Sequence, residues 1–486
     1  MHALTLNLDP SLSPKYLQIA ACLRQAVKTG KITAGESLPS SRQLASQLNT
    51  NRHTVMTALQ ELVAQGWLES AERKGYRVAA KLPVEQSQEI ERPVKDVQNQ
   101  FRWPVNSQIS ALPQEPAAHQ YQYNFAGGMP DVSLFPFDEL RSFMRESMTR
   151  PDANDLNYGN HQGGQGFLEQ AEIYLRRVRG VKDKSLMVVN GSQEALYLIA
   201  QVLLKPGDKV AVESLGYRPA WDAFRTTGAE LVGIRQHSHG IDVDHLGALI
   251  TSQKVKLIYL TPLHQYPTTI TLPLHERMAI YNLAAKHNVV IIEDDYDHEF
   301  HYDSQPLTPL AADDPCGLVI YLSTFSKILF PGCRIGILAV DPALLPYLLN
   351  YRRLMNHKPS FLLQDALGRW MRDGGFERHL RKTTKKYHAR RDHMMTTLNS
   401  LRQQGLPLDC HLPSGGMALW VDVKKDAKAL EVYCRKQNIY LVAEQSFHLN
   451  PEQDQDRYLR LGYAGMDEAQ LSQGLHAMAE FWKRAD

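Results

Sequence analysis

The residues with the clearest chemical potential surround Lys327 in the run YLSTFSKILFPGCRIG, residues 321–336. The lysine follows an apolar stretch. The hydroxyl residues Thr324 and Ser326 stand three and one positions before it, and Arg334 stands seven positions after it. Such a lysine can form an imine with a phosphorylated aldehyde while the hydroxyls and the guanidinium hold the phosphate. A bare Ser-Lys pair would indicate only a surface lysine after a buried strand, whereas the complete motif favours the imine.

Two other stretches carry groups that complement this chemistry. VVNGSQEAL places Gly191, Ser192 and Gln193 between a strand and a helix, where backbone N–H groups at the helix start can hold a phosphate. This turn is weak evidence when taken alone. VIIEDDYDHEF ends a strand in three acidic residues. A carboxylate there can keep a pyridine nitrogen protonated, while a nearby tyrosine hydroxyl bonds the ring oxygen.

The elements that must hold these motifs follow from the hydrophobic pattern. The strand-like runs LMVVN, KVAVE, VKLIYLT, NVVIIED and GLVIYLS alternate with helix-like segments. This order is typical of an α/β fold with a mostly parallel central sheet. We therefore predict one large α/β domain over residues 123–486.

The first 80 residues have a different organisation. Apolar residues recur at helical spacing over residues 16–29, and Ser40 precedes Gln43 by three residues, as in a capping box. Asn51 can cap a third helix that stops at Gly66, and two short extended runs then flank a basic turn. Three helices and a hairpin describe a winged helix-turn-helix. A small helical module that binds no nucleic acid is the alternative.

The amino-acid sequence of this region favours DNA binding over that alternative. The run PKYLQIAACLRQAVKTGKITAGESLPSSRQLASQLNTNRHTVMTALQELVAQGWLES, residues 14–70, resembles the GntR-type DNA-binding domain. In this architecture Arg52, His53 and Thr54, on the first turn of the third helix, face the major groove and read bases of a double-stranded operator. Contacts to phosphates, to a base edge or to the minor groove are expected from Arg42, Arg73, Lys74 and Arg77. The family often has an arginine where Met56 stands, which leaves the operator sequence open.

The large domain also resembles a known family. The Lys327 motif resembles the pyridoxal-phosphate lysine region of fold-type I aminotransferases, and the stretches at residues 124–136 and 157–181 resemble the MocR family of regulators. The resemblance implies pyridoxal 5'-phosphate as the cofactor and Lys327 as its anchor. It implies that Asp294 bonds the pyridine nitrogen and that Tyr296 bonds the ring oxygen. Asp295 is the alternative to Asp294, because an alignment shift of one residue would select it.

Three further residues take their roles from the same resemblance. Tyr217 in VESLGYRPAW would stack on the cofactor ring. Tyr158 corresponds to a tyrosine that reaches the phosphate of the neighbouring subunit, which implies a head-to-tail homodimer. Arg460 in DRYLRLGYAG stands where these enzymes hold the α-carboxylate of the substrate. A strand arginine that extends its charged end to the surface is the alternative for Arg460.

One stretch departs from the enzyme pattern. TPLHQYPTT stands where aminotransferases usually read N-P-x-N-P-T-G, so Tyr266 replaces the asparagine that bonds the ring oxygen and Thr269 replaces the last glycine. His264 and Gln265 are typical of the regulators. These departures favour a sensor over an efficient enzyme.

Composition limits the class of protein and the cell compartment. Apolar residues make up 43% of the chain and charged residues 22%, which is typical of a globular protein. Residues 1–80 carry nine Lys and Arg against five Asp and Glu, a mild indication of nucleic-acid contact. The five scattered cysteines have no metal-ligand spacing and fit a reducing compartment. The first residues lack the pattern of a signal peptide, so a cytoplasmic protein is expected. We also expect no membrane contact and no bound metal.

These observations predict a regulator with three parts: residues 1–80 bind DNA, residues 81–122 form a flexible linker, and residues 123–486 bind the cofactor and an effector. The effector would be an amino acid or amine that forms an external aldimine with the cofactor and thereby changes DNA binding. An active aminotransferase with an accessory DNA-binding domain, and a sensor of the cofactor itself, are the alternatives.

Overall fold

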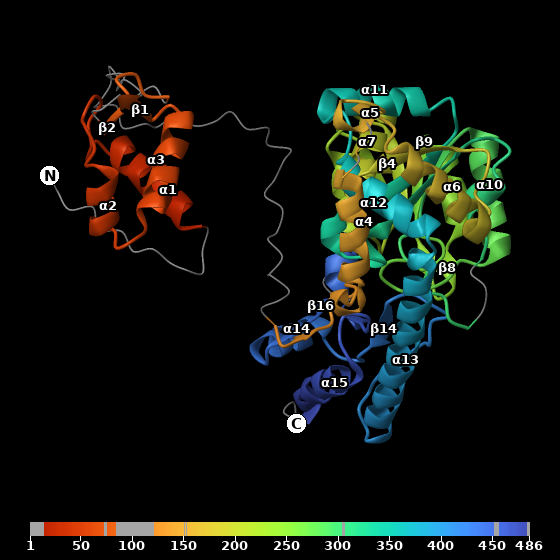
Figure 1. Ribbon diagram of the computed structural model, residues 1–486. Coiled ribbons are helices and arrows are strands. Elements are labelled where there is room, and N and C mark those ends of the chain that lie inside the picture. Colours follow the sequence, from red (N-terminus) through yellow and green to blue (C-terminus); the bar gives the residue numbers. More distant parts are fainter. Residues whose placement is uncertain are drawn as a thin grey trace, which may run out of the picture. The chain divides into compact units, whose positions relative to one another are not determined.

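The computed structural model describes residues 14–71, 75–83, 121–149, 151, 153–303, 307–451 and 456–483. The chain divides into two compact units, Met1–Pro104 and Val105–Asp486, and each is described by itself (Figure 1). Arg73, Lys74 and most of the predicted linker lie outside the described residues.

The first unit has the predicted three helices and hairpin. Its elements are α1 (Lys15–Lys28), α2 (Ser41–Gln47), α3 (Arg52–Ala64), β1 (Leu68–Ala71) and β2 (Gly75–Val78). The two strands pair antiparallel, with Leu68 opposite Val78. Apolar residues from all three helices and from the hairpin form one buried core. This arrangement is a winged helix-turn-helix, as the sequence predicts.

Side-chain caps fix where the second and third helices begin. The Ser40 hydroxyl accepts a hydrogen bond from the backbone N–H of Gln43, and the Gln43 side chain accepts one from the backbone N–H of Ser40. This reciprocal pair confirms the predicted capping box. The Asn51 carboxamide oxygen accepts the backbone N–H of His53 at 2.8 Å, so α3 starts at Arg52.

A seven-stranded sheet forms the centre of the second unit, in the order β4-β12-β11-β10-β9-β5-β6. β12 runs antiparallel to both of its neighbours, whereas the other neighbouring strands pair in parallel. The predicted mostly parallel sheet is thus confirmed. Its strands are β4 (Ser185–Val189), β5 (Lys209–Glu213), β6 (Glu230–Ile234), β9 (Val255–Leu260), β10 (Val290–Asp294), β11 (Val319–Thr324) and β12 (Gly336–Val340).

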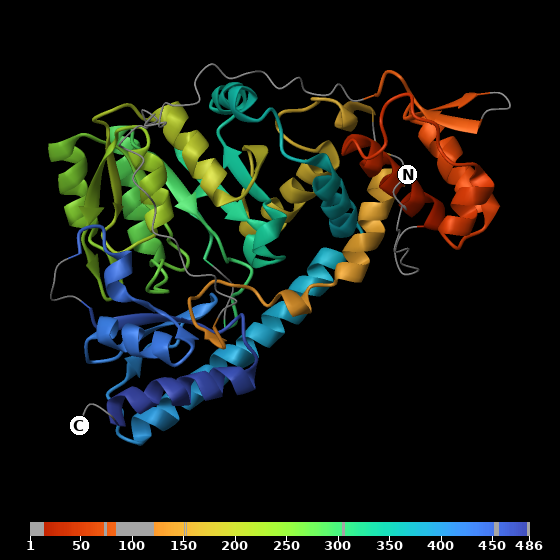
Figure 2. The ribbon, with the colours of Figure 1, turned by 90° about the vertical axis from the view of Figure 1, so that its left-hand side faces the viewer.

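Helices cover both faces of this sheet (Figures 1 and 2). Because side chains alternate along a strand, Met187 and Val189 of β4 enter one core and Leu186 and Val188 enter another. The first core includes α7 (Ser192–Leu203), α8 (Arg218–Arg225) and α11 (Leu345–Met355). The second includes α6 (Gln165–Arg179), α9 (Val243–Gln253), α10 (Leu274–His287), α12 (Phe361–Arg372) and part of α4 (Phe137–Thr149).

A smaller subdomain follows in the sequence. Its sheet has the order β13-β14-β17-β16, with β13 (Asp409–Cys410), β14 (Ala418–Asp422), β16 (Val442–Ala443) and β17 (Tyr458–Gly462). Its helices are α13 (Gly375–Gln403), α14 (Ala427–Lys436) and α15 (Glu468–Lys483). The remaining short elements are α5 (Ala153–Leu156), the pair β3 (Tyr123–Asn124) and β15 (Ile439–Tyr440), and the pair β7 (Gln236–His237) and β8 (Gly240–Ile241).

The helix α13 joins the two cores of this unit. Phe376 near its start is buried with the large sheet, while Met394 is buried with the smaller one. Figure 2 shows α13 passing from the large sheet to α15. Tyr121, which the sequence assigns to the linker, already stacks on Tyr440 of this unit, with ring centroids 5.1 Å apart.

No helix within the described ranges is long and apolar enough to cross a membrane. Among the same residues, no group of histidine, cysteine or acidic side chains could hold a metal ion. The five cysteines are free thiols.

Candidate functional site

Lys327 lies directly after β11, at the end of the short 3-10 turn Phe325–Lys327. Its Nζ donates a hydrogen bond to the carbonyl oxygen of Gly128 at 2.8 Å. Burial of the amine, together with the nearby charge of Arg460, lowers the pKa of Lys327 to about 8. A lowered pKa enlarges the share of neutral amine near neutral pH, and the neutral amine is the form that attacks a carbonyl carbon.

The two acidic residues at the end of β10 have different surroundings. Asp294 accepts a hydrogen bond from the Tyr259 hydroxyl at 2.8 Å, and its buried Oδ1 has no hydrogen-bond partner within the described residues. Burial raises the pKa of Asp294 to about 7, and the positive charge of Lys327 acts against this rise. Asp294 therefore lies close enough to Lys327 for the two charges to interact.

The charge of Asp295 is already balanced. Its carboxylate pairs with the Arg179 guanidinium at 2.6 Å and accepts the Tyr321 hydroxyl at 2.6 Å. Burial acts to raise the pKa of Asp295, but Arg179, His298 and the Tyr321 hydroxyl together outweigh it, so the pKa is lowered. Neighbouring residues of a strand point to opposite faces. The surroundings thus favour Asp294 over Asp295 as the partner of a ring nitrogen on the Lys327 side.

A cradle for an anion lies where β4 and β11 end and β12 begins. Gly191 caps α7 with a left-handed φ of +82°, and a Cβ added there would lie 2.7 Å from Nη2 of Arg334. The same Nη2 donates to the carbonyl oxygen of Asn190 at 2.6 Å. Only glycine permits this approach of the guanidinium to the start of α7, where Ser192 and Gln193 contribute the first N–H groups.

The hydroxyl residues of the motif line the same end of the sheet. Thr324 is the last residue of β11, opposite Gly336 of β12, and its Oγ1 accepts the backbone N–H of Ser326 at 3.2 Å. Both Thr324 and Ser326 are buried. Gly336 in turn lies opposite Val189, two residues before Gly191. The fold thus brings together the phosphate-binding residues predicted from the separate motifs.

Three tyrosines from separate segments of the second unit pack together. Tyr217, at the start of α8, packs edge-on against Tyr266 with ring centroids 5.2 Å apart, and Tyr296 packs against Tyr266 at 6.3 Å. The Tyr296 hydroxyl donates to the carbonyl oxygen of His264 at 2.9 Å. Tyr266, which stands where the enzymes have asparagine, is therefore in contact with both tyrosines predicted to touch the cofactor.

Arg460 is a buried cation with unused donors. Its side chain lies in β17, is 1% exposed, and places Cζ 4.6 Å from the centroid of the Tyr266 ring. Its Nε and Nη1 are buried without a hydrogen-bond partner among the described residues. A Cβ added at Gly127 would lie 1.9 Å from Nη1, so a glycine is required there. Since Arg460 does not reach the surface, its surroundings disfavour the interpretation as a strand arginine that extends to water.

Together these residues fit a phosphorylated pyridine aldehyde. The glycine cradle and Arg334 suit the phosphate, the unpartnered Oδ1 of Asp294 suits a ring N–H, and Lys327 supplies an amine of lowered pKa. Pyridoxal 5'-phosphate is such a molecule.

The predicted base-reading residues lie on the surface of the first unit. Arg52 and His53, at the start of α3, are exposed, and Thr54 is half-buried. Nε of Arg52 donates to the Ser41 hydroxyl at 3.3 Å, which links α3 to the start of α2. Arg42 is exposed beside them.

The wing residue Arg77 has an acidic partner within its own hairpin. Its guanidinium is paired with Glu69 on the opposite strand, with Nη2 and Oε2 2.6 Å apart. A phosphate would have to compete with this carboxylate. Arg73 and Lys74, which were predicted to act beside it, lie outside the described residues.

Two family descriptions match the chain. Residues 134–478 match "Aminotransferase class I and II", and residues 15–78 match "Bacterial regulatory proteins, gntR family". The probable rhizopine catabolism regulatory protein MocR of Rhizobium meliloti is 30% identical over 96% of this chain and 93% of its own length. The chain belongs to the MocR-type transcriptional regulators. Its first unit is accordingly a GntR-type DNA-binding domain, and its second has the fold-type I aminotransferase fold.

Other relatives of this MocR-type regulator support the same assignment of its two units. The transcriptional regulator TauR of Rhodobacter capsulatus is 28% identical over 94% of both chains. Among solved structures, the kynurenine aminotransferase of Pyrococcus horikoshii is 30% identical, with a TM-score of 0.69 over 75% of this chain and 91% of that one. The enzyme thus matches the second unit, whereas the regulators match nearly the full length.

Tyr158 lies apart from the cofactor-site contacts described above. It is 68% exposed, and its ring packs at 4.9 Å from the ring of His357, which follows α11. Its exposure makes it available to a second subunit of the regulator.

Sequence reasoning missed two residues of the regulator's site. Tyr259 donates to Asp294 from the neighbouring strand, and its only signal was a tyrosine hydroxyl in the strand-like run VKLIYLT. Gly127 admits the guanidinium of Arg460, and its signal was the Gly-Gly pair in NFAGGMP.

Proposed function

We propose that this regulator senses an amino acid at the Lys327 site and converts its binding into a change of DNA binding. The chain is a pyridoxal-phosphate-dependent regulator of the MocR type with a GntR DNA-binding domain. When bound, the cofactor supplies an aldehyde for which the effector amine competes with the amine of Lys327. The effector therefore needs an amino group.

Each residue around the cofactor has a proposed role in holding it. Lys327 anchors it, Asp294 keeps its ring nitrogen protonated, Tyr296 bonds the ring oxygen, and Tyr217 covers the ring face. The phosphate is held by Gly191, Ser192, Gln193, Thr324, Ser326 and Arg334. The gathering of these groups at one end of the sheet supports the roles.

Arg460 carries the proposal that the effector is an acid. A buried guanidinium whose Nε and Nη1 have no hydrogen-bond partner among the described residues is costly, and a carboxylate would accept a charge-assisted hydrogen bond from one of these donors. A Cβ added at Gly128 would lie 3.3 Å from Nζ of Lys327 and 4.0 Å from Nη1 of Arg460, so the two cations lie close together. An effector with an amino group and a carboxylate on one carbon could therefore reach both residues.

A spectral titration tests this proposal directly. The holoprotein is titrated with a panel of amino acids and with their decarboxylated amines while the cofactor absorbance and the release of keto acid are followed. We expect wild type to bind an amino acid more tightly than the matched amine by about 1.5 to 3 kcal/mol, the range for hydrogen bonds to charged groups. Arg460→Ala should lose this preference and keep the cofactor.

The same titration separates the rival functions. Keto-acid release over many turnovers would indicate an active aminotransferase, which the presence of Lys327, Asp294 and Tyr296 favours as the second candidate. In a separate operator-binding assay, a response to the cofactor without any amine would indicate a sensor of the cofactor alone. Equal affinity of wild type for amino acids and amines would contradict the role of Arg460.

We also propose that the regulator is a head-to-tail homodimer in which Tyr158 approaches the phosphate bound by its partner. Large apolar side chains of α4, α5 and α11 support this proposal, because they are exposed on a single chain. They are Met148 in α4 at 66% exposure, Leu156 in α5 at 63%, and Tyr347 and Leu354 in α11 at 65% and 85%. Exposed apolar surface of this kind commonly marks a subunit interface.

A further inference from the structure

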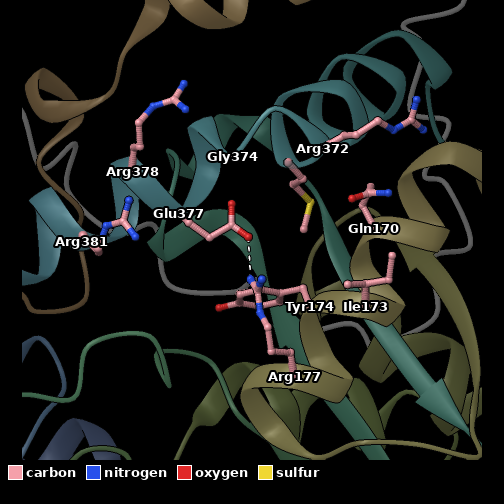
Figure 3. Close-up of a pocket in the computed structure, with 10 residues that line it drawn as sticks. Gln170, Ile173, Tyr174, Arg177, Arg372, Gly374, Glu377, Arg378 and Arg381 are labelled. Carbon is pink, nitrogen blue, oxygen red and sulfur yellow. Dashed lines mark hydrogen bonds and ion pairs between the residues drawn. The ribbon is translucent and has the colours of Figure 1, made fainter.

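A cavity of the large unit lies between α6, the end of α12 and the start of α13. Its volume is about 530 Å³, a size that accommodates a small organic molecule. Figure 3 shows the side chains around it. None of its lining residues belongs to the cofactor or effector residues described above.

Four arginines surround this cavity: Arg177, Arg372, Arg378 and Arg381. They come from three helices, and Glu377 is the acidic residue among the lining side chains. The cavity therefore carries a net charge of about +3 at neutral pH, since arginine stays protonated in proteins. A surface this rich in guanidinium groups selects for anions.

The four guanidinium groups differ in how they are satisfied. Arg177 pairs with Glu377 across the cavity at 2.6 Å (Figure 3), and Arg378 pairs with Asp373 at 3.3 Å. The side chains of Arg372 and Arg381 have no hydrogen bond or ion pair with any other described residue. As far as the described part of the chain reaches, their guanidinium donors are thus open to a ligand.

The rest of the wall indicates the chemical class of that ligand. Ile173, 53% exposed, and Met371 add apolar surface from α6 and α12 to a rim of charges. Guanidinium forks bind phosphate through paired, charge-assisted hydrogen bonds. We propose that this cavity is a second ligand site, which binds a small phosphorylated molecule with two or more negative charges.

Contacts of α13 connect this cavity to Lys327. Phe376, in the first turn of α13, packs against Phe325 with ring centroids 5.7 Å apart. One turn on, Nε2 of His379 lies 2.9 Å from the carbonyl oxygen of Ile328, the residue that follows Lys327. An anion that draws Arg177 away from Glu377 would act on the same turn of α13. Its binding is therefore expected to change the surroundings of Lys327.

Calorimetric titration of the full-length holoprotein with inorganic pyrophosphate tests the site. The cofactor stays saturating, so that its own phosphate site is filled. We expect one pyrophosphate per chain, and a loss of affinity of at least about tenfold in the double variant Arg372→Ala, Arg381→Ala. Arg402→Ala, which removes one exposed charge from the far end of α13, should bind within about twofold of wild type.

Citrate and operator DNA serve as competing ligands. Citrate binding as tight as pyrophosphate binding would overturn the phosphate assignment. If the double variant bound pyrophosphate like wild type but lost affinity for all DNA, the arginines would contact DNA and the proposal would be wrong. The absence of saturable pyrophosphate binding to wild type would also overturn it.

The link to Lys327 has its own readout. Pyrophosphate should shift the absorbance of the cofactor bound to wild type and should leave that of the double variant unchanged. Pyrophosphate binding without any spectral change in wild type would contradict the connection through α13. Neither result depends on whether an amino acid is the effector.

Discussion

Lys327 is the residue on which the proposed chemistry depends. We expect Lys327→Ala to lose the covalent cofactor, because no other lysine is placed by the motif to form the imine. After borohydride reduction of wild type, mass spectrometry should find the pyridoxyl label on the peptide that contains Lys327. Lys182→Ala, a change at another lysine of the same unit, should keep the label. A label on any other lysine would refute the assignment.

The lowered pKa of Lys327 leads to a prediction about pH. The neutral amine attacks the aldehyde, and its fraction rises as the pH passes upward through the pKa of about 8. Uptake of the cofactor by the apoprotein should therefore accelerate over the same pH range, as followed by stopped-flow absorbance. In Arg460→Ala the removal of a nearby positive charge should raise the pKa and move the profile to higher pH.

Arg460→Lys is the matched control for this experiment, because it keeps the positive charge and should keep the profile. An unchanged profile in Arg460→Ala would show that burial alone sets the pKa of Lys327.

At the scale of single elements, α3 is the helix whose start is predicted to read DNA. Arg52→Ala should abolish specific operator binding, since a bidentate base contact is worth about 1 to 3 kcal/mol and a dimer would lose it twice. The cofactor spectrum should stay unchanged. Electrophoretic mobility shifts with operator and non-operator DNA measure the effect.

Lys15→Ala, at the start of α1, serves as the charge-matched control and should keep specific binding. If Arg52→Ala bound the operator like wild type, the start of α3 would not be the reader.

At the scale of the whole molecule, the exposed apolar residues of α4, α5 and α11 predict the dimer interface. Leu354→Glu places a charge where an apolar contact is expected, so it should convert the dimer into monomers. Cofactor affinity should fall as well, because the monomer lacks the Tyr158 of a second subunit. Sedimentation velocity measures the oligomeric state.

Val432→Glu, at an exposed apolar residue of α14, is the control and should remain dimeric. A dimeric Leu354→Glu variant would place the interface elsewhere.

Local features of the sequence determined where helices begin and in which order strands and helices follow one another. The capping pair of Ser40 and Gln43 and the cap at Asn51 fixed where α2 and α3 start, because these bonds form between residues at most three positions apart. The alternation of apolar runs with helical segments predicted the mostly parallel sheet. The motif around Lys327 likewise indicated the lysine region of a fold-type I aminotransferase, since its residues lie within a single short stretch.

Tertiary structure decided which side chains meet. The sequence left Asp294 and Asp295 as alternatives, because adjacent strand residues differ only in the face they occupy. Packing then brought Arg179 to Asp295 and Tyr259 to Asp294. The register of the hairpin also pairs Arg77, a predicted DNA contact, with Glu69. Such contacts join residues that local patterns treat independently, so only the packed fold could determine them.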